Sequence, residues 1–164
     1  MLVVEPSLLA LAGEVLDRCR GHGLRLATAE SCTGGLIAGC LTAIAGSSVV
    51  FDRGFVTYSN EAKIAELGVS AGLLAGRGAV DEEVARAMAE GAMTNAGVDV
   101  AVAVTGIAGP DGGSPAKPVG LVYIASARAG AETLCERHVF PGGRQEVRAA
   151  TVEAALRLLA RQLG

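Results

Sequence analysis

The chain has 164 residues, of which 51% are hydrophobic and only 3% aromatic, and tryptophan is absent. A length of this order fits a single domain, which we expect to cover residues 1–164. The formal net charge is −3, which argues against a nucleic-acid partner, because such proteins normally present a basic surface.

The first half of the chain alternates helical and strand patterns. Apolar side chains recur at helical spacing in two stretches, and shorter apolar runs between them are typical of buried strands. Glycines follow each predicted helix, as is common at helix ends. The predicted elements are a helix over Ser7–Arg20 that Gly21 and Gly23 end, a strand over Leu24–Thr28, a helix over Leu36–Ala45, a strand over Val49–Tyr58 with a bulge at Gly54, and a helix over Glu61–Leu67.

One stretch of the first half, Ser31–Phe51, carries no charged residue. It is long enough to cross a bilayer, which takes about 20 residues. Glycines and serines divide it into a helix pattern and a strand pattern, so we expect a buried helix and strand and no membrane partner.

The second half of the chain ends in a strand meander. A helix is predicted over Asp81–Ala96, with Asp81 as its cap, and a fully buried strand over Val100–Val104. A loop rich in glycine and proline follows over Gly106–Pro118. The remaining elements are antiparallel strands over Val119–Ser126 and Thr133–Phe140 and a helix after Gly143. This order predicts a three-layer α/β/α sandwich with a mixed, mostly parallel sheet.

Ser31 stands where a predicted strand turns into a helix. Unpaired N–H groups at the start of a helix point outward, so the amides of Thr33, Gly34 and Gly35 are candidates to hold an oxyanion created by a serine nucleophile. Ser31 is otherwise a helix cap, but Thr33 is available for that task. Cys32 is the rival nucleophile, and we favour Ser31 because a thiolate needs a basic neighbour.

Lys63 lies at a second strand-to-helix turn. With Asn60 as the N-cap, Lys63 falls in the first helical turn, where the helix dipole disfavours an ammonium group. Burial lowers the pKa of a lysine further, and a neutral lysine is able to act as general base for a serine. Tyr58 precedes it and either orients Lys63 or packs its ring in the sheet.

The loop after Val104 is not a Walker A or a Rossmann fingerprint, because the expected lysine and helix are missing. Thr105 and Gly106, at the end of the central strand, are candidates to contact a ligand, and Arg144, after two glycines, is a candidate to hold a phosphate. The four cysteines have no CxxC spacing, so we expect neither a zinc site nor any cofactor, and the thiols are typical of the reducing cytoplasm.

Three segments resemble one known family. They are TAESCTGGLIAGCLT at 28–42, GSSVVFDRGFVTYSNEAKIAELGV at 46–69 and TGIAGPDGGSPAKPVG at 105–120. They are similar to the nicotinamide-nucleotide amidohydrolases, also called the CinA carboxy-terminal domain or competence/damage-inducible family, in their stand-alone form.

The resemblance implies that the protein hydrolyses the carboxamide of nicotinamide mononucleotide to nicotinate mononucleotide and ammonia in pyridine-nucleotide recycling. Ser31 matches the nucleophile of the family and Lys63 its base, while Tyr58 and Thr105 match pocket positions. The family also associates, which implies a homo-oligomer. Two alternatives remain: a Ser–Lys amidase acting on another nucleotide-like amide, and a non-catalytic nucleotide-binding module.

Overall fold

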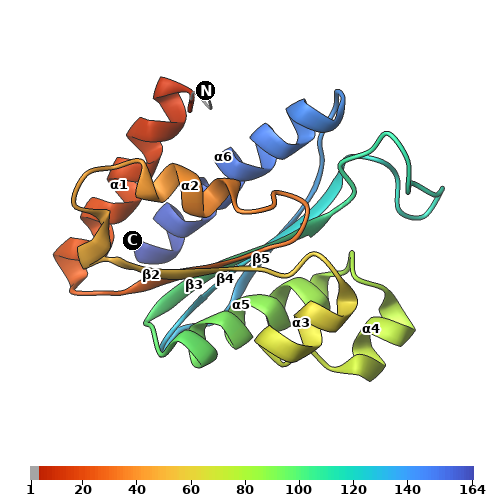
Figure 1. The fold of residues 1–164 in the computed structure, drawn as a ribbon, viewed down its shortest axis with the longest axis horizontal. Helices are drawn as coiled ribbons and strands as arrows, with labels where there is room; N and C mark the ends of the chain where they lie inside the picture. The colour runs from red at the N-terminus through yellow and green to blue at the C-terminus, as the bar shows by residue number, and fades with distance from the viewer. Residues whose placement is uncertain (1–3) are drawn as a thin grey trace.

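The computed structural model describes residues 4–164. In this part of the chain, five strands form one mixed sheet with helices on both faces, which confirms the predicted α/β/α sandwich (Figure 1). Residues 1–3 of the predicted single domain lie outside the described residues. The elements are α1 (Pro6–His22), β1 (Leu26–Glu30), α2 (Leu36–Thr42), a 3-10 helix (Ser47–Val49), β2 (Phe51–Val56), α3 (Asn60–Leu67), α4 (Ala71–Arg77), α5 (Glu82–Ala96), β3 (Val100–Gly106), β4 (Leu121–Arg128), β5 (Leu134–Val139) and α6 (Arg144–Leu163).

The strands lie in the order β2-β1-β3-β4-β5. β1 is parallel to both of its neighbours, β2 and β3, whereas β4 is antiparallel to β3 and β5. The carboxyl ends of β1, β2 and β3 therefore meet at one edge of the sheet, which is where ligands bind in open α/β sheets.

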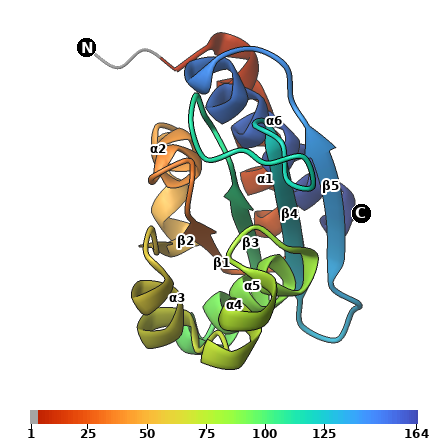
Figure 2. The same cartoon turned by 90° about the vertical axis from the view of Figure 1, so that its right-hand side faces the viewer.

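The sheet separates two apolar cores. One core packs α1, α2 and α6 on the sheet, and includes Leu16, Leu41 and Leu156. The other packs α3, α4 and α5 on the opposite face, and includes Leu67, Ala89 and Ala101. Figures 1 and 2 show the two helical layers on either side of the strands. No helix between residues 4 and 164 combines the length and the apolar character that crossing a membrane requires.

Helix ends follow the glycines only in part. α1 continues through Gly21 to His22 and ends at Gly23, whose φ of 67° is left-handed. The predicted bulge is not at Gly54, because the register between β1 and β2 shifts at Leu26 and Ala27 instead. Gly54 serves close packing: a Cβ there would lie 2.8 Å from Thr28 Oγ1.

Another glycine lets two helices touch. A Cβ on Gly91 of α5 would collide with the carbonyl oxygen of Leu67, the last residue of α3. α3 therefore lies directly against α5, without an intervening side chain at this position.

Candidate active site

Ser31 directly follows β1. Its N–H donates to the carbonyl of Val104 on β3, at 3.2 Å, so the position of the serine is tied to the central strand. The strand predicted over Leu24–Thr28 lies two residues later in the structure, at Leu26–Glu30. In the structure Glu30 is the last residue of β1 and is fully buried.

Lys63 lies in α3, which follows β2. The prediction that Asn60 caps this helix is wrong: the N-cap is Ser59, whose hydroxyl accepts from Ala62 N at 3.0 Å. Asn60 is instead the first helical residue and is exposed, and Lys63 is the fourth. The serine hydroxyl is an equally good cap, so the one-residue shift has no signal in the sequence.

The two side chains meet inside the protein. Lys63 Nζ lies 3.0 Å from Ser31 Oγ. The lysine side chain is only 1% exposed and Ser31 9%. The sequence places each residue at its own strand-to-helix turn, and the structure brings the two into hydrogen-bond contact.

Two further partners fix the lysine amine. Lys63 Nζ donates to the carbonyl oxygen of Thr57 at 2.7 Å and reaches that of Tyr58 at 3.4 Å. A carbonyl oxygen only accepts, so in the neutral amine the two N–H bonds point to these carbonyls. The lone pair then faces the Ser31 hydroxyl, which is the orientation that a general base requires.

Burial is the main cause of the lowered pKa of Lys63. Loss of hydration lowers the pKa of its ammonium group, and the thiol of Cys32 opposes this shift weakly. No carboxylate contributes to the shift. Burial, which the sequence also suggested, is therefore the main cause of the lowering.

Cys32 does not compete as nucleophile. Burial raises the pKa of its thiol to about 11, so the thiolate is scarce at neutral pH. The side chain is 6% exposed and packs with the apolar core.

A cavity of about 290 Å³ opens over the serine and the lysine. Thr105 and Gly106, the predicted ligand contacts at the end of β3, form part of its wall. Arg144 and Tyr58 close another side. The lining residues are Ser31, Cys32, Tyr58, Lys63, Ala79, Val80, Thr105, Gly106, Ile107, Ala108, Gly109, Asp111, Gly112 and Arg144. Asn60 is not among them.

Hydrogen bonds fix the polar wall of this cavity. Arg144 donates to the carbonyl oxygen of Gly109 at 2.9 Å and to Tyr58 Oη at 3.1 Å. Thr105 Oγ1 donates to the carbonyl oxygen of Ala79 at 2.8 Å. Arg144 is exposed, so part of its guanidinium remains accessible to a ligand.

A buried carboxylate caps the start of α2. The carboxylate of Glu30 accepts from Ile37 N at 2.8 Å, Ala38 N at 3.0 Å and Thr33 Oγ1 at 2.6 Å. The buried carboxylate thus satisfies two of the unpaired N–H groups at the start of α2, those of Ile37 and Ala38.

The three residues expected to hold the oxyanion, Thr33, Gly34 and Gly35, do not line the 290 Å³ cavity. Gly34 N donates to the carbonyl of Ser31 at 3.1 Å, which closes the turn. The structure thus places these residues behind Ser31 as parts of its support.

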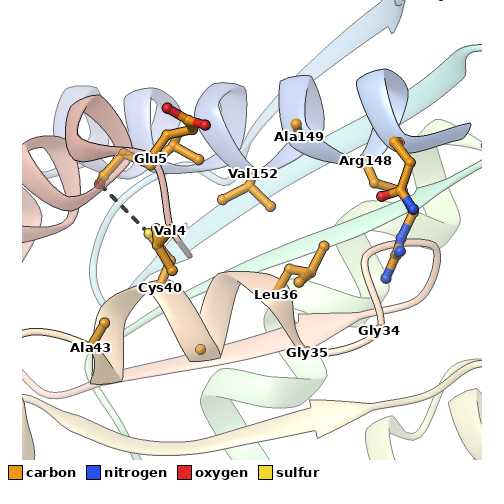
Figure 3. A pocket seen from close by; sticks show the side chains of 13 residues that line it. Val4, Glu5, Gly34, Gly35, Leu36, Cys40, Ala43, Arg148, Ala149 and Val152 are labelled. Carbon is orange, nitrogen blue, oxygen red and sulfur yellow. Dashed lines mark hydrogen bonds between the residues drawn. The ribbon is translucent and has the colours of Figure 1, made fainter. Parts of the chain in front are cut away.

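A second cavity, of about 550 Å³, lies between α1, α2 and α6 (Figure 3). Its wall contains Gly34 and Gly35 from the back of the Ser31 turn and apolar side chains such as Leu36 and Val152. Neither Ser31 nor Lys63 reaches it, so we assign the chemistry to the smaller cavity.

Between residues 4 and 164, no group of three or more His, Cys, Asp and Glu side chains is arranged to hold a metal ion.

Comparisons with known proteins identify the family of the chain. The family model described as the CinA C-terminal domain matches residues 8–163. A CinA-like protein of Syntrophobacter fumaroxidans is 55% identical over 147 residues, 90% of this chain and 34% of that protein. The chain spans about a third of the length of this relative and of others like it.

Other relatives match over their whole length. The nicotinamide-nucleotide amidohydrolase PncC of Escherichia coli K12 is 48% identical over 98% of this chain and 97% of its own. The crystal structure of the competence/damage inducible protein CihA from Agrobacterium tumefaciens has a TM-score of 0.95 and 48% identity, and covers 98% of both chains. The chain therefore belongs to the CinA C-terminal domain family.

Proposed function

We propose that the protein hydrolyses the carboxamide of nicotinamide mononucleotide to nicotinate mononucleotide and ammonia, with Ser31 as nucleophile and Lys63 as general base. The observation that carries the proposal is the 3.0 Å contact between a buried lysine amine and a serine hydroxyl at the base of a cavity. The name of the full-length E. coli relative supports the choice of substrate and of the nucleotide-recycling role.

The reaction begins with a proton transfer. The neutral amine of Lys63 takes the proton of Ser31, and the serine oxygen attacks the carbonyl carbon of the amide. The tetrahedral intermediate collapses when Lys63 returns the proton to the leaving nitrogen, which departs as ammonia. Water then attacks the acyl-serine with Lys63 again as base, and nicotinate mononucleotide leaves.

The polar groups of the cavity wall are candidates to hold the nucleotide. Arg144, with Tyr58 beside it, carries the positive charge that suits the phosphate. Thr105 and Gly106 lie near the serine and suit the part of the substrate close to the amide. Asn60 lies outside the cavity lining, so our proposal gives it no substrate contact.

The experiment is ammonia release from three compounds: nicotinamide mononucleotide, its unphosphorylated riboside and free nicotinamide. The expected result is efficient release from the mononucleotide alone, abolished by Ser31→Ala and retained by Ser48→Ala at an exposed serine. Release from the riboside or from free nicotinamide, but not from the mononucleotide, would point to a different amide substrate. Saturable binding of nicotinamide mononucleotide without turnover would indicate a non-catalytic nucleotide-binding module instead of an enzyme.

Two further parts of the proposal concern the cellular compartment and the oligomeric state of the protein. All four cysteines are free, which fits the reducing cytoplasm, and we propose that the protein acts there. We also propose a homo-oligomer, as the family resemblance implies, and sedimentation equilibrium of the purified chain tests it.

A further inference from the structure

Arg148 of α6 reaches across to the turn that carries Ser31. Its Nε donates to the carbonyl oxygen of Cys32 at 3.1 Å and its Nη2 to that of Thr33 at 3.2 Å. These are the two residues directly after the serine, although Arg148 lies 116 and 115 positions from them in the sequence. Figure 3 shows the side chain pointing from α6 toward the turn at Gly34.

The arginine acts from behind the turn. It lines the 550 Å³ cavity between α1, α2 and α6 and is not part of the wall of the 290 Å³ cavity that holds Ser31 and Lys63. Its contacts are to backbone oxygens on the far side of the nucleophile. The structure therefore gives Arg148 no contact with a substrate in the smaller cavity.

A guanidinium group is suited to fixing a backbone segment. It is planar and holds its N–H donors in a rigid fork, so two consecutive carbonyls bound by one arginine are fixed relative to each other. The other side of the turn is fixed by the hydrogen bond from Ser31 N to Val104 O. Arg148 and β3 thus bind different residues of the same turn.

α6 does not need this contact to stay in place. Nine of its residues are buried, among them Val152, Leu156 and Leu159, and they pack in the apolar core. The two hydrogen bonds of Arg148 are therefore available for a local task at the turn.

We propose that Arg148 is a positioning residue, which holds the Cys32–Thr33 peptide so that Ser31 Oγ faces Lys63 Nζ. The inference rests on the proposed function for its catalytic readout. A misplacement of about 1 Å costs as much as 10²-fold in rate, so a loosened turn is expected to lower kcat. Substrate affinity should change little, because Arg148 lies outside the substrate cavity.

The test compares two arginines of the same helix. Arg148→Met keeps the aliphatic stem and removes the donors, and Arg157→Met does the same at an exposed site paired with Glu153. We expect kcat of Arg148→Met to fall roughly 10- to 100-fold with KM within about 3-fold. Arg148→Lys, which retains one donor group, should recover part of the loss, and Arg157→Met should match wild type.

Two measurements do not depend on the substrate. Hydrogen exchange of a peptide spanning residues 32–36 should be faster in Arg148→Met than in Arg157→Met. Covalent labelling of Ser31 by a fluorophosphonate should be slower. Equal kcat in the two variants, or faster exchange with unchanged kcat, overturns the positioning role. If the wild type releases no ammonia, the proposed function fails, and Ser31 labelling decides: equal labelling in both variants overturns the inference.

Discussion

The two cavities on either side of the Ser31 turn differ in what their walls offer. The cavity of about 290 Å³ contains a lysine, a serine, an arginine and a carboxylate, all on loops or on the first turns of helices after strands. The cavity of about 550 Å³ is almost twice as large but lies between the sides of helices, and most of its wall is apolar. Reactive groups that face each other, rather than volume, therefore mark the candidate site.

The difference follows from where each wall comes from in the fold. Side chains along a helix that faces a core must be apolar, so α1, α2 and α6 leave a mainly apolar space where they do not touch. The loops that follow the carboxyl ends of parallel strands lie outside the packed layers, so they carry polar residues without disturbing a core. Ser31, Lys63 and Thr105 all follow or end such strands.

The largest expected effect is the loss of the serine or the lysine. Ser31→Ala and Lys63→Met should each lower kcat by about 10³-fold or more, since a general base alone contributes roughly 10²–10⁴-fold. Ammonia release under saturating nicotinamide mononucleotide measures this. Circular dichroism should show that both variants are folded. A folded variant with wild-type turnover would show that the smaller cavity is not the active site.

The pH dependence of activity should report Lys63. Burial lowers the pKa of this lysine below 10.5, and only the neutral amine accepts the serine proton. kcat/KM should therefore rise about tenfold per pH unit below that pKa and level off before pH 10.5. A rate that is flat from mildly acidic to alkaline pH would contradict the role of the lysine.

Glu30→Gln tests the support of the turn on the side of α2. The amide keeps the shape of the carboxylate, but its NH2 group replaces one of the two acceptor oxygens, so the N–H of either Ile37 or Ala38 loses its acceptor. We expect a loss of about 1–3 kcal/mol in the free energy of unfolding, measured by urea denaturation. Glu14→Gln, on an exposed face of α1, should change it little, and equal values would show that the buried carboxylate is dispensable.

A smaller effect concerns the stability of the protein with and without the buried amine. The folded-state pKa of Lys63 is lowered, so between that value and 10.5 the unfolded chain binds a proton that the folded chain does not. As pH falls through this window, the wild type loses stability relative to Lys63→Met. Tm of the two proteins across this window measures the difference, with about 2–4 °C per kcal/mol expected at this size. A constant difference would argue against the lowered pKa.

The smallest expected effect is in the larger cavity. Ala43→Leu adds apolar volume at its exposed rim, where Ala43 closes α2, and kcat and KM should stay within about twofold. A strong loss of turnover would show that the larger cavity takes part in the reaction, and the two cavities would then no longer differ in function.

Much of the fold was predictable because the patterns are strong. The buried run of Val100–Val104 and the capped helix after Asp81 appear as expected, with Asp81 accepting from Glu83 N and Val84 N. α4 was missed, since seven residues that include Gly72 and Gly76 give little periodicity, although Ser70 is a good cap. Tertiary contacts override weak local preference in such a short helix.

The candidate site was predictable only in part. Ser31 and Lys63 stand in recognisable turns, so their convergence at one sheet edge could be expected. Glu30 could not be identified as a buried capping group, because its partners Ile37 and Ala38 become available only once α2 is placed. Arg148 gave no signal either, since its hydrogen bonds to residues 32 and 33 arise solely from the packing of α6.

The contact between Gly91 and Leu67 has a consequence for the base. Leu67 lies one helical turn after Lys63, and α3 rests on α5 at that point without a side chain between them. Any larger residue at position 91 would push the end of α3 away from α5 and move Lys63 Nζ relative to Ser31 Oγ. In a saturation library, position 91 should tolerate glycine alone, and selection for turnover would act on a residue outside the cavity lining.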